Sequence, residues 1–105
     1  MTRGRILIAE DDAAVRALIA ELLAEKGYEP VATETVAEAK RLLDAHHFDL
    51  AVVDLGLKDG SGHDVTRHIR ASSGSAAMPV IMLTGAKALE DMERKIGRAS
   101  CRERV

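Results

Sequence analysis

The chain is organised around residues 49–56, Asp-Leu-Ala-Val-Val-Asp-Leu-Gly. The apolar run at residues 50–53 is short and rich in valine and leucine, which is typical of a central parallel strand covered on both faces. It ends in Asp54, and the binding groups of open α/β sheets gather at the carboxyl ends of such strands. Three glycines within residues 56–62 predict a loop whose backbone can approach a bound group closely. A strand-end aspartate can also simply start a turn, so Asp54 alone leaves a structural role open.

A second buried strand is predicted over residues 5–9, and it too ends in acids: Glu10, Asp11 and Asp12. Asp12 is well placed to cap the amphipathic helix predicted over residues 13–26. Glu10 and Asp11 have no comparable structural explanation. Adjacent acids repel one another, so cation binding is the more economical interpretation of a cluster that directly follows a buried strand.

Strands and helices alternate along the rest of the chain. The further elements are predicted at residues 29–33, 36–46, 62–71 and 78–84. The segment beginning at Thr35 has a capping-box pattern with Glu38. Because the connections are short, this alternation predicts one α/β domain, a doubly wound parallel sheet with right-handed crossovers.

The last predicted strand ends in a hydroxyl group, that of Thr84. A threonine at this position can satisfy its own backbone, and it is also suited to bonding an anionic group held at Asp54. The adjacent His46 and His47 are poor candidates for metal ligands, because neighbouring side chains at a helix end point in different directions.

Composition narrows the class of protein. A chain of 105 residues with 47% hydrophobic and 30% charged residues is expected to form one globular domain. It has no apolar run near the roughly 20 residues of a membrane span and no signal peptide, so a cytoplasmic location is expected. An aromatic content of 2% and a net charge of -2 argue against a nucleic-acid surface. The single cysteine, Cys101, cannot form an internal disulfide.

Taken together, these motifs resemble the receiver domain of bacterial two-component response regulators over residues 3–94. The resemblance rests on ILIAEDD at residues 6–12, VVDLGL at 52–57, DGSG at 59–62 and PVIMLTG at 79–85. It implies a flavodoxin-like doubly wound parallel sheet with strand order 2-1-3-4-(5). It also implies phosphorelay signal transduction, in which the domain accepts a phosphoryl group from a sensor histidine kinase or a phosphotransfer protein.

The resemblance assigns a role to each candidate site residue. Asp54 would be the phosphoacceptor, and Thr84 the switch hydroxyl. Asp11 and Asp54 would ligate Mg²⁺ with the backbone carbonyl of Gly56, while Glu10 would act largely through water. A carboxylate nucleophile and an anionic phosphoryl group must share one small site, and a divalent cation offsets their repulsion. Such a domain is expected to be a phosphoprotein and not an enzyme.

Two departures from the family pattern stand out. Lys58 occupies a position where the family usually has proline, so the loop after Asp54 lacks that rigid residue. The family also has a lysine at the end of a fifth strand, and its spacing from Asp54 places it near position 106, beyond Val105. The fifth strand and fifth helix are therefore expected to be missing.

Residues 95–105, with sequence KIGRASCRERV, do not resemble the remaining part of a receiver domain. Residues 96–105 can be encoded in one frame by DNA that resembles a common sequencing-library adapter. We therefore expect residues 1–94 to be a partial receiver domain and residues 95–105 to be a non-native, adapter-derived tail. Without that tail the chain has 11 basic and 16 acidic residues, a net charge of -5.

Two other functions compete with this one. A phosphatase of the haloacid dehalogenase type also uses a strand-end aspartate, but it needs a second acid two residues later, where this chain has Gly56. A degenerate or truncated pseudo-receiver that acts only as a protein-interaction module remains the alternative. No membrane or nucleic-acid contact is expected through this domain. A C-terminal output domain of the full-length protein could bind DNA, and phosphorylation could make that protein a homodimer.

Overall fold

The computed structural model describes residues 3–83 of the chain. Its elements are β1 (Arg5–Ala9), α1 (Ala13–Glu25), β2 (Glu29–Thr33), α2 (Val36–Ala45), β3 (Leu50–Asp54), β4 (Gly56–Leu57), β5 (Gly60–Ser61), α3 (Gly62–Ala71) and β6 (Val80–Leu83). Every strand and helix predicted within this range is present. Thr84 and the predicted tail at residues 95–105 lie outside the described residues. No helix in the described part of the chain is long and apolar enough to cross a membrane.

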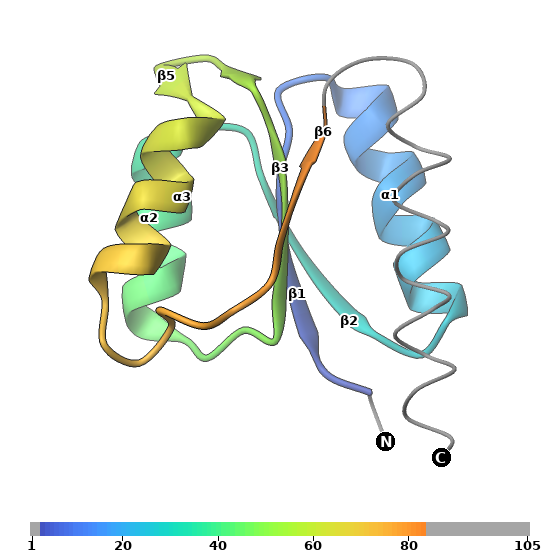
Figure 1. Ribbon diagram of the computed structural model, residues 1–105. Helices are drawn as coiled ribbons and strands as arrows, with labels where there is room; N and C mark the ends of the chain where they lie inside the picture. The colour runs from blue at the N-terminus through green and yellow to red at the C-terminus, as the bar shows by residue number, and fades with distance from the viewer. Residues whose placement is uncertain (1–2, 84–105) are drawn as a thin grey trace.

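The four longer strands form one parallel sheet in the order β2-β1-β3-β6. With β6 as the fourth strand of the sheet, this is the predicted flavodoxin-like order 2-1-3-4. Helix α1 lies on one face, and α2 and α3 lie on the other (Figure 1). In the register between β1 and β3, Ala9 pairs with Val53, so the two central strands end at the same level of the sheet.

The sheet separates two hydrophobic cores. On the α1 face, alternate strand residues such as Ile6, Ile8 and Val52 pack with Ile19 and Leu23. On the opposite face the core consists of Leu7, Ala9, Val36, Ala39, Phe48, Ala51, Val53, Leu57, Val65, Ile69 and Met78. Burying one large aliphatic side chain stabilises the fold by about 1.5–3 kcal/mol, so two filled faces make β1 and β3 the most firmly held strands.

The predicted helix ends agree with the structure. Asp12 caps α1 by accepting hydrogen bonds from the backbone N–H groups of Ala14 (2.9 Å) and Val15 (3.1 Å). Gly27 follows the helix with a φ of 91°, a left-handed conformation in which glycine is favoured. At α2, the Thr35 hydroxyl oxygen accepts a bond of 3.1 Å from the N–H of Glu38, which is one half of the predicted capping box.

The structure corrects the predicted loop over residues 56–62. Strands β4 and β5 form a short antiparallel hairpin, and α3 begins directly at Gly62. A full capping box between Ser61 and Asp64 starts this helix. Gly62 is required there because a Cβ atom would lie 2.2 Å from the backbone oxygen of Asp54, whereas Gly56 has open space around it. The close approach therefore serves the packing of α3 on β3.

We predict that Gly62→Ala destabilises the domain by about 1–3 kcal/mol, because the added methyl group would force α3 away from the end of β3. Gly74→Ala is the matched control, since no atom lies within 4 Å of a Cβ at that loop position. Urea unfolding followed by circular dichroism measures both changes. Equal unfolding free energies for the two variants would contradict the prediction.

Candidate functional site

Three carboxylates meet where β1 and β3 end. Glu10 and Asp11 directly follow β1, and Asp54 is the last residue of β3. One carboxylate oxygen of each residue lies within 4.8 Å of those of the other two. Within residues 3–83, no other group of three or more acidic, histidine or cysteine side chains is close enough to share a metal ion. The structure thus brings together three of the predicted site residues.

Glu10 is the buried member of this cluster, with 5% of its surface exposed. The backbone N–H of Glu10 donates to the Thr33 carbonyl (3.0 Å), and its carboxylate accepts from the N–H of Asp12 (3.1 Å). Burial is the main reason that the pKa of Glu10 is raised to about 7. The hydrogen bond from the Asp12 N–H lowers this pKa, while side-chain hydrogen bonds with Asp54 and Asp11 and the charge of Asp54 raise it further.

Burial is the main cause of this raised pKa, and the nearby Asp11 and Asp54 carboxylates add to it. Near neutral pH a substantial fraction of Glu10 therefore carries a proton in the metal-free fold. Hard oxygen ligands that converge in this way suit Mg²⁺, which commonly binds one or two carboxylates and keeps several waters. The donor set therefore fits a divalent cation.

Exposure differs within the cluster. Asp11 is exposed and Asp54 is half-buried, so both side chains can be reached from solvent. The backbone around Asp54 is fixed by its neighbour: the Leu55 N–H donates to the Leu83 carbonyl (3.4 Å), and the Leu55 carbonyl accepts from the N–H of Gly62 (2.8 Å). The structure thus presents a carboxylate of fixed position to molecules in solution.

Positive charge lies beside the cluster in a position that the sequence analysis did not identify. The Arg16 guanidinium donates to the backbone carbonyl of Glu10 (2.9 Å) and lies 3.6 Å from the Glu34 carboxylate. Lys58 Nζ lies 3.1 Å from the same Glu34 oxygen. The only sequence signal for Arg16 is its place about one turn into the helix that follows the acids. Pairing with Glu34 shows that both cations are already partly neutralised.

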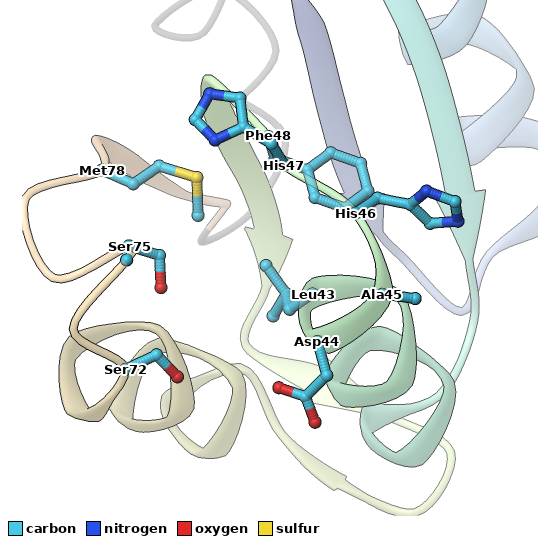
Figure 2. A pocket seen from close by; sticks show the side chains of 10 residues that line it. Leu43, Asp44, Ala45, His46, His47, Phe48, Ser72, Ser75 and Met78 are labelled. Carbon is cyan, nitrogen blue, oxygen red and sulfur yellow. The ribbon is translucent and has the colours of Figure 1, made fainter.

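The remaining predicted site residues are not tested by the geometry. Gly56 begins β4, two residues after Asp54, and is exposed. Thr84, the predicted switch hydroxyl, lies outside the described residues. His46 and His47 follow the last residue of α2, are exposed, and direct their imidazole rings in different directions, as predicted (Figure 2).

A surface depression of about 330 Å³ lies at the end of the strands opposite to the acidic cluster. Its lining comes from the end of α2, the segment before β3, and the connection from α3 to β6, with Leu43, Phe48 and Met78 as its apolar members (Figure 2). These segments precede β3 and β6, whereas Asp54 ends β3. The depression is therefore separate from the carboxylates.

A comparison with known protein families identifies the chain. The family model described as the response regulator receiver domain matches residues 6–100. The chain belongs to this family. The match continues past residue 94, where the sequence analysis placed the end of the receiver-like segment, and it does not test the proposed adapter origin of residues 95–105.

Curated relatives of this receiver domain are transcriptional regulatory proteins. The chain is 34% identical over 90 residues to the phosphate regulon protein PhoB of Escherichia coli. This alignment covers 86% of the chain and 39% of PhoB. It is 38% identical over 87 residues to the virulence protein PhoP of Salmonella choleraesuis, covering 83% of the chain and 38% of PhoP. The receiver domain thus spans about two fifths of the length of these relatives.

Solved structures agree with the receiver fold. The receiver domain of a sensor histidine kinase from Pseudomonas aeruginosa PAO1 has a TM-score of 0.75 and 28% identity, covering 86% of this chain and 74% of its own. That structure contains a magnesium ion in its active-site cleft. The HemR receiver domain of Leptospira biflexa has a TM-score of 0.71 and 33% identity, covering 93% of this chain and 76% of its own.

We predict that the metal-free protein loses stability as the pH rises from about 4.5 to about 7, relative to the Glu10→Gln variant. In this interval Glu10 binds a proton in the folded state, with a pKa of about 7, but releases it in the unfolded state, with a pKa of 4.5. The difference between their free energies of unfolding should change by on the order of 3 kcal/mol over this interval.

Urea unfolding in EDTA at several pH values checks this expectation. The free energy of unfolding of the wild-type protein should increase relative to that of Glu10→Gln as the pH is lowered. A difference between the two proteins that does not change with pH would show that Glu10 ionises normally in the fold.

Proposed function

We propose that this receiver domain accepts a phosphoryl group on Asp54 from the phosphohistidine of a sensor histidine kinase or a phosphotransfer protein. The observation that carries the proposal is the convergence of the Glu10, Asp11 and Asp54 carboxylates within 4.8 Å at the carboxyl ends of β1 and β3. Asp54 is the member at the end of a buried strand with its side chain within reach of solvent, which suits a nucleophile.

In the transfer, a carboxylate oxygen of Asp54 forms a bond to phosphorus while the bond from phosphorus to the donor's imidazole nitrogen breaks. The electron pair returns to that nitrogen, and the product on Asp54 is an acyl phosphate. There is little covalent work for the protein beyond positioning and charge stabilisation. Glu10, Asp11, Asp54 and the carbonyl of Gly56 would hold Mg²⁺, which when bound offsets the charge on the phosphoryl oxygens.

The described contacts explain how the chain itself prepares Asp54. The parallel register with β1 and the hydrogen bonds of Leu55 fix the end of β3. Burial of Glu10 constrains one carboxylate of the cluster, while Asp11 remains exposed to solvent. The nucleophile and the other acids therefore already lie close together in the fold, which lowers the entropic cost of assembling the site.

We further propose that the domain is a stoichiometric phosphoacceptor and not an enzyme, with Thr84 as the switch hydroxyl that responds to the phosphoryl group. The residue two positions after Asp54 is Gly56, so the second acid that a haloacid dehalogenase phosphatase needs is not at that position. The curated relatives are transcriptional regulators of more than twice this length, so we propose that the full-length protein carries a C-terminal output domain that acts on DNA. We propose a cytoplasmic location for that protein and its dimerisation on phosphorylation.

Asp54→Asn is predicted to abolish phosphorylation, because an amide oxygen is a far weaker nucleophile than a carboxylate. The protein is incubated with Mg²⁺ and radiolabelled phosphoramidate, whose P–N bond resembles that of phosphohistidine. We expect a label on the wild-type protein that hydroxylamine removes, and at least a 100-fold slower reaction in EDTA, since the anionic groups would then repel each other.

Asp44→Asn is the matched control, because Asp44 is an exposed aspartate near the end of α2, outside the acidic cluster, and it should be labelled like the wild-type protein. Equal labelling of Asp54→Asn and the wild-type protein would refute Asp54 as the acceptor. A wild-type protein that binds Mg²⁺ but takes no label would favour the alternative of an interaction module.

A further inference from the structure

The hairpin that follows Asp54 contacts the beginning of α2, although the two segments are more than 20 residues apart in the chain. Strand β4 leaves Asp54 after a single residue, and the turn between β4 and β5 consists of Lys58 and Asp59. Both of these side chains contact the segment formed by residues 34–37. The position of the hairpin is therefore tied to that of a helix.

Asp59 makes the closest of these contacts. One carboxylate oxygen accepts a hydrogen bond from the N–H of Val36 (2.6 Å), and the other accepts from the N–H of Ala37 (3.1 Å). These are first-turn donors that have no partner within the helix, and the positive end of the helix dipole lies there. The bonds lower the pKa of Asp59, with the Val36 bond as the main cause, so the carboxylate is ionised at neutral pH.

Packing on both sides of Asp59 reinforces the contact. Leu57 is buried in the same hydrophobic core as Val36. On the other side, a Cβ atom at Gly60 would lie 3.2 Å from the Val36 side chain, so the backbone of the hairpin runs directly against α2. A displacement of the hairpin would break both the hydrogen bonds and this packing.

The ion pair between Lys58 and Glu34 is the weaker anchor. Its atoms are 3.1 Å apart, but the two side chains are 57% and 44% exposed. Exposed ion pairs contribute little because water and salt screen them. Lys58 also stands where a proline would restrict the backbone, and lysine imposes no such restriction. Asp59 is exposed as well, but its two bonds go from an ionised carboxylate to backbone N–H groups at a helix N-terminus, so they are the stronger polar restraint on the turn.

We propose that Asp59 is a positioning residue for the cation site: by capping α2 from the β4–β5 turn, it holds the segment that carries Gly56 in the conformation that binds Mg²⁺ beside Asp54. The proposal rests on the proposed function, because it takes Gly56 as a ligand. Without Asp59 the hairpin would sample other positions, and the apparent affinity would fall with the fraction of molecules in the binding conformation.

Isothermal titration calorimetry with MgCl₂ on the full 105-residue chain tests the proposal. Asp59→Ala should weaken Mg²⁺ binding about 10-fold, as expected for a residue that supports metal ligands without touching the metal. Asp59→Asn should fall between Asp59→Ala and the wild type, because its single carbonyl oxygen can accept only one of the two bonds. Phosphorylation of Asp59→Ala should need more Mg²⁺ but reach a rate near that of the wild type at saturation.

Thr35→Ala is the matched control, since it removes the other cap of the same helix, the bond to the Glu38 N–H, without touching the hairpin. It should bind Mg²⁺ like the wild type. Circular dichroism confirms that each variant is folded at the temperature of the titration.

Two results would overturn the positioning role: wild-type affinity in Asp59→Ala, or an equal loss in Asp59→Ala and Thr35→Ala, which would show a general effect of weakening α2. Failure of the proposed function is distinguishable from these results, because the wild-type protein itself would then take no phosphoryl label, whether or not it binds Mg²⁺.

Discussion

The grouping of three carboxylates at one end of the parallel sheet is the constraint that the rest of the fold must support. Glu10, Asp11 and Asp54 lie close together at one edge of the sheet, and burial raises the pKa of Glu10 to about 7. Such a cluster opposes folding unless other interactions hold it in place. The packing of the strands that carry the cluster offsets this cost, which is how functional sites commonly retain unfavourable local arrangements.

The two central strands supply that support. Ile6, Leu7, Val52 and Val53 are fully buried, two on each face of the sheet, so β1 and β3 cannot slide or rotate without opening a core. Their parallel register ends both strands at the same level, and the acids emerge there. Stability and site geometry therefore have the same physical origin. The depression at the other end of the strands contains no comparable group of acids.

The conformations of the segments that follow β1 and β3 depend more on contacts with neighbouring helices than on their own sequence. Gly62 lets α3 begin against the backbone of Asp54, while the hairpin before it is bonded to α2 through Asp59. On the opposite side of the sheet, Arg16 of α1 bonds the carbonyl of Glu10 and approaches Glu34. Helices from both faces thus reach the segments around the acids.

The sequence by itself determined the parallel α/β fold, the caps at Asp12 and Thr35, and the meeting of Glu10, Asp11 and Asp54. Those features follow from local periodicity, from capping chemistry, and from the rule that parallel strands end at a common edge. Only the tertiary structure decided the raised pKa of Glu10, the hairpin after Asp54, and the bonds of Asp59 to α2. These depend on burial and on contacts between residues far apart in the chain, which no local pattern encodes.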